Sequence, residues 1–316
     1  MEQVAIISTR VIILALFIVL GFIVIKTKYV KKDAVPFVAN IISRIMFPMW
    51  LAAKLLSPDI TIDVLISELP LYIGGISMTL ILLGFGFLLA KFLKLPDARK
   101  TVFYIAFATA NAIFLALPII EDLYGTPGAI KGTIVSLGAD TINWTLGITL
   151  LGISGNNVSG QDTKSHMHIS PATVTFIACV IFKLTTLSFP KLILDPMEKL
   201  GSALPYMGMI FLGMTLSNIK FKEVFTEKLT YIFLPLKIIV IPLVLNIVLK
   251  LTGILSDDNI NILTIIYSTS PMVSMTPFYA EYGLDSKFGS SVTCACIMFN
   301  IVTMPLIFWI STFIKF

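Results

Sequence analysis

The sequence predicts an all-α membrane protein with ten transmembrane helices. Hydrophobic residues make up 57% of its 316 residues and charged residues only 13%, which is about half the charged share of a soluble domain. A soluble core of this size cannot bury so much apolar surface. The apolar segments are long and do not alternate with period two. This excludes a membrane β-barrel and favours helices, which satisfy their own backbone hydrogen bonds in lipid.

Ten apolar segments are separated by polar connectors. They span 8–26, 36–56, 70–93, 101–121, 128–152, 171–189, 197–217, 230–251, 260–280 and 288–312. The first lacks a small-residue cleavage site, so we interpret it as a retained helix and not as a signal peptide. The only long polar connector lies at the midpoint of the chain. We therefore expect a first five-helix unit at 1–153, a cytoplasmic linker at 154–170 and a second five-helix unit at 171–316.

Basic residues in the loops predict the orientation, because cytoplasmic loops carry an excess of Lys and Arg. If the N-terminus is outside, the outer loops and tails hold six basic residues and the cytoplasmic loops hold thirteen. The thirteen are Lys26, Lys28, Lys31, Lys32, Lys91, Lys94, Arg99, Lys100, Lys164, Lys220, Lys222, Lys228 and Lys287. We predict a multi-pass protein of a bacterial plasma membrane with both termini extracellular. The net charge of +5 is mostly due to these lysines in the cytoplasmic loops.

The two halves are predicted to form an inverted repeat. Five helices per half make the second half enter the membrane from the opposite side. A shift of 159 residues aligns NAIFLALPIIEDLYG with SPMVSMTPFYAEYG, placing Asn111 on Ser270 and Pro118 on Pro277. The next segments also match, with Asn143 close to Asn300.

The fourth segment has an asparagine near mid-membrane and a proline two turns later. A proline destabilises the interior of a helix but is well tolerated in its first turn. We therefore expect Pro118 to open a second half-helix, and Pro277 to do the same in the ninth segment. The unpaired N–H groups at such half-helix starts attract anions. Asn111 would add an amide donor.

Hydroxyl groups from the other crossing segment complete this predicted anion site. They belong to Ser268, Thr269 and Ser270. A plainer interpretation stays open at this point. Prolines often only kink membrane helices, and an asparagine can simply join neighbouring helices by a hydrogen bond.

Several stretches resemble the auxin efflux carrier family, which includes the PIN-FORMED auxin exporters of plants and bacterial malate and malonate permeases. They are NAIFLALP, IISRIMFPMWLAAKLL, TINWTLGITLLG, GSALPYMGMIFLGMTLS and MFNIVTMPLIFW. The resemblance covers nearly the whole chain, and it rests on the order and spacing of the stretches because none is diagnostic alone.

The resemblance implies two inverted five-helix repeats in which helices four and nine break and cross at prolines. It implies that helices 1, 2, 6 and 7 form a dimerising scaffold, and that helices 3–5 and 8–10 form a moving transport domain. The family's substrate asparagine falls on Asn111, and its crossover prolines fall on Pro118 and Pro277. The chain lacks the long central loop of the plant exporters, so regulation by phosphorylation there is not expected.

Charged residues inside the spans are further candidates. Asp140 is a candidate coupling residue, because a lone acid is expensive to bury; wetting by headgroups at a helix end is the plainer interpretation. In the resembling plant exporters a glutamine usually occupies its position, so a charged role does not carry over. Arg44 and Lys237 could pair with Asp140 or neutralise a dianionic substrate, although snorkelling or pairing with lipid phosphate is the plainer role. Lys54 is expected to snorkel.

No cofactor or metal is expected. The chain has no P-loop, and His166 and His168 are its only histidines. Cys179, Cys294 and Cys296 lack metal-ligand or CxxC spacing, so we expect buried free thiols. An enzyme or sensor would need a nucleophile and base or a metal set in the spans, so we predict no enzyme activity.

The predicted function is secondary transport of small organic anions by alternating access. The substrates would be mono- or dicarboxylates such as malate, or auxin-like acids. The expected partners are the carboxylate, the lipid bilayer, a second copy of the chain and, if transport is coupled, protons; no nucleic acid is expected. The alternative is a sodium- or proton-coupled symporter or antiporter of the related crossover fold with a different substrate. Such carriers usually have two acids near the crossing, and none lies in 106–118 or 268–277.

Overall fold

The computed structural model describes residues 2–57, 60–159, 171–185, 187, 189–217, 224 and 226–314. These residues form α-helices with short π- and 3-10-helical turns and no β-strand, so the all-α prediction is confirmed for them. The histidines, most of the Ser154–Ser170 linker, Lys164, Lys220 and Lys222 lie outside the described residues. The first six residues of the predicted linker belong to a helix that ends at Ser159.

The helices of the first half follow the chain as α1 (Glu2–Lys26), α2 (Ala34–Ile41), η1 (Ile42–Met46), α3 (Phe47–Leu55), α4 (Ile62–Ser67), α5 (Leu69–Phe92), α6 (Asp97–Ala108), η2 (Ala112–Ala116), α7 (Leu117–Ile142), η3 (Asn143–Gly147) and α8 (Ile148–Ser159). Within α7 the chain reverses direction at Gly125, whose φ of 64° favours glycine. Hence α7 contains the end of the fourth predicted segment and the start of the fifth.

The helices of the second half are α9 (Pro171–Leu184), α10 (Lys191–Ser202), α11 (Leu204–Ser217), α13 (Thr230–Pro235), η4 (Leu236–Val240), α14 (Ile241–Thr252), α15 (Asp257–Tyr267), η5 (Val273–Met275), α16 (Thr276–Glu281) and α17 (Ser286–Phe313). Each of the ten predicted segments contains helix among its described residues, but the fourth and ninth are interrupted at 109–111 and 268–272, and α9 ends at Leu184 where the sequence predicted 189.

Six stretches of the described chain are long and apolar enough to cross a membrane, judged by length and composition. They are Ala34–Leu55, Ile62–Phe92, Asp97–Val158, Lys191–Ser217, Thr230–Thr252 and Ser286–Ser311. The third of these stretches contains two predicted segments, so the six stretches cover seven of the ten. The first and sixth predicted segments correspond to shorter apolar helices, Ile12–Lys26 and Thr173–Leu184, and the ninth predicted segment is split into short helices. The number of ten crossings therefore stays a prediction.

Prolines explain most of the π-helical turns. Pro48, Pro118 and Pro242 each lie two residues after such a turn, and only η3, among the described π-turns, has no proline behind it. A proline cannot donate to the carbonyl four residues back and clashes with it. A wider turn relieves that clash while the helix continues.

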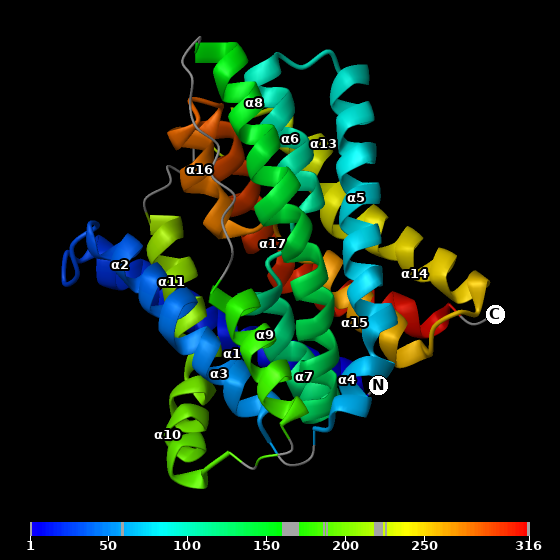
Figure 1. Ribbon diagram of the computed structural model, residues 1–316. Helices are drawn as coiled ribbons and strands as arrows, with labels where there is room; N and C mark the ends of the chain where they lie inside the picture. The colour runs from blue at the N-terminus through cyan, green and yellow to red at the C-terminus, as the bar shows by residue number, and fades with distance from the viewer. Residues whose placement is uncertain are drawn as a thin grey trace.

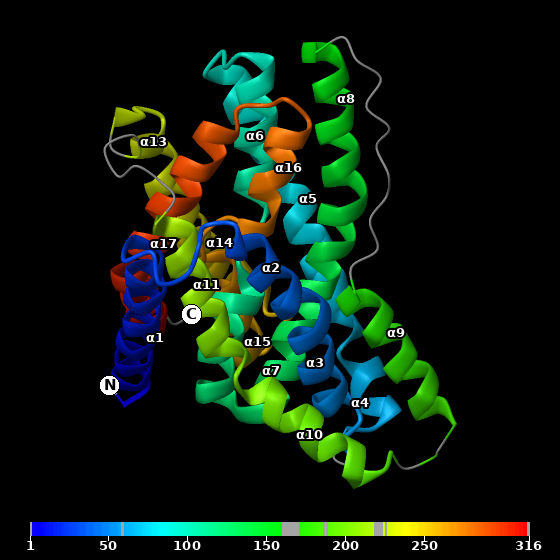
Figure 2. The ribbon, with the colours of Figure 1, turned by 90° about the vertical axis from the view of Figure 1, so that its left-hand side faces the viewer.

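Contacts between helices are extensive. Helix α1 runs along α11, and α3 contacts α9 and α10; α5 contacts α6 and α7, and α15 contacts α14 and α7 (Figures 1 and 2). Helix α1 also contacts α7 and α17. Helices α1 and α11 approach closely at Gly21 and Gly213, where a Cβ atom would collide with the backbone of Ile210 and Ile18. Small residues permit such close packing in membranes, where dispersion contacts and not water expulsion hold helices together.

Candidate functional site

Two interruptions in the helices define the candidate site. The first separates α6 from η2 at 109–111, where Thr109 is extended and Asn111 precedes the next helical turn. The second separates α15 from η5 at 268–272. In Figures 1 and 2, α6 and α16 lie towards one end of the molecule and α15 and the lower part of α7 towards the other.

Hydrogen bonds join the two interruptions directly. The backbone N–H of Asn111 donates to the carbonyl of Ser270 and to Oγ1 of Thr269, both at 2.9 Å. The side-chain Nδ2 of Asn111 donates to Oγ of Ser270 at 3.3 Å. In the opposite direction, the N–H of Met272 donates to Oγ1 of Thr109 at 3.3 Å. A threonine hydroxyl from each interruption thus accepts a backbone N–H from the other.

The structure therefore brings together Asn111, Ser268, Thr269 and Ser270. All four are at most 2% exposed. Buried polar groups need partners, and here the two interruptions supply many of them to each other. The half-helices that begin at η2 and η5 also present backbone N–H groups without intrahelical partners at their first turns. Such first-turn N–H groups are the donors that bound anions commonly accept from in proteins.

Pro118 and Pro277 lie further along the chain from the two interruptions than the sequence predicted. The first interruption is at 109–111, and Pro118 lies beyond it, after the π-turn η2. The prediction that Pro118 opens the half-helix is wrong, because the wider turn accommodates the proline without breaking the helix. Pro277 does lie in the first turn of α16, but the 3-10 turn η5 precedes it.

Two buried side chains donate hydrogen bonds to backbone carbonyls where α6 and α15 end. We call the contact between the two interruptions the crossing. Lys237 Nζ donates to the carbonyl of Phe107 at 3.0 Å, in the last turn of α6. Asn300 Nδ2 donates to the carbonyl of Ser268 at 2.8 Å, just beyond α15. Asn300 Oδ1 is buried and has no hydrogen-bond partner among the described residues. The sequence indicated Lys237 only as a charged residue in a span, without this partner.

Asp140 lies inside α7 and is 7% exposed, so it is not wetted at a helix end. Its carboxyl group interacts with Asn143 and lies near the Tyr267 hydroxyl. Neither cation suggested as its partner pairs with it in the described structure. Arg44 is exposed, and Lys237 is directed at Phe107. The pattern of hydropathy could not reveal this, because pairing depends on which helices become neighbours.

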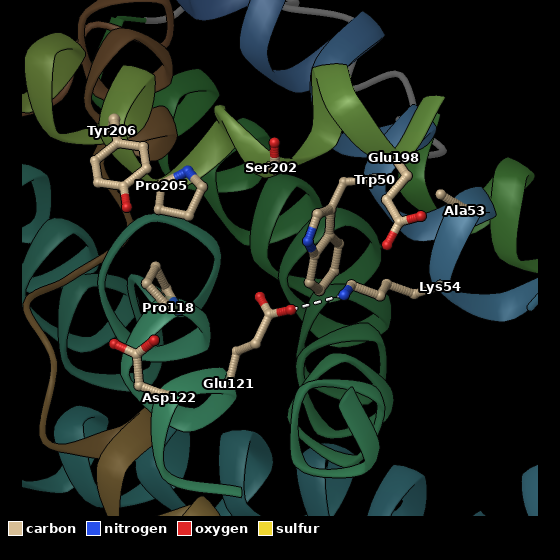
Figure 3. A pocket seen from close by; sticks show the side chains of 10 residues that line it. All are labelled: Trp50, Ala53, Lys54, Pro118, Glu121, Asp122, Glu198, Ser202, Pro205 and Tyr206. Atoms are coloured by element: carbon tan, nitrogen blue, oxygen red, sulfur yellow. Dashed lines mark ion pairs between the residues drawn. The ribbon is translucent and has the colours of Figure 1, made fainter. Parts of the chain in front are cut away.

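A cavity of ≈ 290 Å³ lies next to the second half of the interrupted helix, between α3, α7, α10 and α11 (Figure 3). Glu121, Asp122 and Glu198 line it together with Pro118, Trp50, Ala53, Lys54, Ser202, Pro205 and Tyr206. Lys54 forms an ion pair with Glu121 at 2.7 Å, a partner that the sequence did not predict. This ion pair links α3 to α7 across the cavity.

Phe114 lies between Asn111 and Pro118 along the chain and packs against α11. Its ring is 5.7 Å from that of Phe211. Gly208 permits this approach, since a Cβ atom there would lie 2.8 Å from the ring of Phe114. The crossing is thus packed against α11 on this side, and the cavity does not include Asn111.

The three cysteines are free and buried, as the sequence predicted. Among the described residues no group of three or more His, Cys, Asp or Glu side chains could hold a metal ion.

The apolar helices, the paired interruptions and a comparison with protein families together define the class of this protein. A family model described as a membrane transport protein matches residues 6–309, which is most of the chain. The chain belongs to this family, the auxin efflux carrier and membrane transport protein family. No curated protein matches it.

Proposed function

We propose that this membrane transporter is a secondary carrier of small organic anions, with mono- or dicarboxylates as substrates. The observation that carries the proposal is the buried contact between the two helix interruptions, which gathers Asn111, Thr269 and Ser270 at one point. A carboxylate there would accept hydrogen bonds from the Asn111 amide and from the first turns of two half-helices.

The mechanism would be alternating access. In this scheme α5–α8 and α13–α17 move as a transport domain against a scaffold of α1–α3 and α9–α11. The close packing of α1 on α11 supports a rigid scaffold. An inverted repeat is part of the same proposal. The 159-residue shift places Asn111 on Ser270, and these two residues meet each other at the crossing, as residues next to a two-fold axis would. A homodimer through the scaffold is part of the same proposal.

The proposed orientation puts both termini outside a bacterial plasma membrane. The basic connector between α5 and α6, the end of α8, and α13 and α16 lie at the same end of the molecule (Figures 1 and 2). This common end supports a single cytoplasmic face. The cavity lined by Glu121 and Glu198 would then open towards the outside.

Uptake of labelled carboxylates into proteoliposomes tests the proposal. Purified protein should accumulate malate, malonate or indole-3-acetate above the level of protein-free liposomes, and Asn111→Ala should lose most of that uptake. Uptake that needs Na⁺ for every substrate would favour the alternative, a sodium-coupled carrier of the crossover type. If none of these acids enters above the background, the organic-anion proposal is wrong.

A further inference from the structure

Lys237 is a buried cation that the proposed transport mechanism does not yet use. Its side chain is 0% exposed. Among the described residues its one hydrogen bond goes to the carbonyl of Phe107, at 3.0 Å, and no carboxylate lies within ion-pair distance. An ammonium group has three N–H donors, and only one of them has a partner among the described residues. No negatively charged side chain there compensates the charge of the ammonium group.

The surroundings of Lys237 offer little other stabilisation. Phe233, one turn earlier on α13, packs edge-on against Phe103, Phe107 and Phe288. Cys296 on α17 is near enough to interact electrostatically. The end of α6 contributes a partial negative charge of about half a unit. A full positive charge in such apolar packing is costly unless a negative charge comes close.

The anion site proposed above can supply that charge. Phe107, which holds the ammonium group, precedes Asn111 by four residues, a chain length of at most ~14 Å. At a separation of ~10 Å and an effective dielectric constant of ~20, attraction between an ammonium and a carboxylate changes affinity by about tenfold. Lys237 also lies on η4, which contacts α17. Helix α17 in turn contacts α6 and α15, the two helices that end at the crossing.

We propose that Lys237 is a specificity-determining residue that provides the resident positive charge for a carboxylate substrate bound at the crossing. This inference rests on the proposed function and deepens it. The site would select anions over uncharged analogues of the same shape. The charge would come from the protein, and the polar groups of Asn111 and Ser270 would orient the carboxylate.

The test compares two substitutions that remove the charge in different ways. Lys237→Gln keeps a donor near the Phe107 carbonyl, and Lys237→Met does not. The matched control is Lys250→Met, because Lys250 also donates to carbonyl groups, those of Ser311 and Ile314. It lies 13 residues further along the same helical stretch, about 20 Å away. Calorimetry and thermal unfolding would be measured with malonate, malate and indole-3-acetate, and with malonamide as the uncharged probe.

We expect both Lys237 variants to bind the carboxylate about tenfold more weakly than the wild type and Lys250→Met to bind it normally. Their ligand-free melting temperatures should be equal to the wild type or higher, since replacing a buried charge by a neutral side chain is often neutral or stabilising. A merely structural lysine would give the reverse pattern, with lower stability and unchanged affinity.

Unchanged affinity in either folded Lys237 variant would overturn the inference and leave the organic-anion proposal intact. Failure of both variants to fold would also overturn it, because Lys237 would then be a structural residue. If the wild type binds none of the three carboxylates, the proposed function fails first and this inference fails with it. Equal binding of malonate and malonamide by the wild type would also overturn the inference, because the site would then not select for charge.

Discussion

Replacing Asn111 by alanine should separate substrate binding from stability. Two of the three hydrogen bonds that Asn111 makes to the other interruption come from its backbone N–H, and alanine keeps both. Only the bond from Nδ2 to Ser270 is lost, and at 3.3 Å it is long. We therefore expect the free energy of unfolding to fall by only about 0.5–1.5 kcal/mol.

Carboxylate binding should suffer more. A hydrogen bond to a charged group contributes about 1.5–3 kcal/mol, so Asn111→Ala should weaken affinity by roughly ten- to a hundredfold. Calorimetry on the purified protein measures the affinity, and thermal unfolding without ligand measures the stability.

Asn246→Ala is the matched control for this experiment. Asn246 is also fully buried and its Nδ2 makes one bond, to Thr264 Oγ1 at 3.1 Å. It lies on α14, outside both interruptions. This variant should lose similar stability and keep its affinity. If Asn111→Ala binds carboxylates as tightly as the wild type, or if Asn246→Ala weakens binding equally, Asn111 does not contact the substrate.

Three further predictions follow from the ion pairs, the buried acid and the loops. Lys54→Glu and Glu121→Lys should each slow uptake, and the double variant should recover it; stability should change by less than about 1 kcal/mol, because both side chains are partly exposed. No recovery would show that the pair does not act as a unit. Asp140→Asn should abolish any stimulation of uptake by an imposed pH gradient, whereas equal responses of variant and wild type would exclude Asp140 as the coupling residue. With the native cysteines buried, an impermeant thiol reagent outside intact cells should label a cysteine at exposed Asp63 and not one at exposed Lys94; the opposite pattern would invert the topology.

The sequence located the candidate site well in one respect and poorly in another. Asn111 and the Ser268–Ser270 stretch could be found because polar residues near mid-span are expensive in lipid and therefore informative. The break itself was assigned to Pro118, since a proline is the usual local signal. The chain instead breaks at 109–111, where the freed backbone N–H of Asn111 donates to the carbonyl of Ser270, 159 residues away. Those contacts have no local signature.

The sequence by itself determined that this is an all-helical membrane protein, where most of its apolar segments lie, and the family to which it belongs. Composition and segment length carry that information, because lipid demands long apolar helices. Only the tertiary structure decided the partners of the charged residues. Lys237 donates a hydrogen bond to the carbonyl of Phe107, 130 residues away, and Lys54 forms an ion pair with Glu121. The physical reason is that lipid and protein interior are both apolar, so hydropathy along a membrane helix does not distinguish the face that meets another helix from the face that meets lipid.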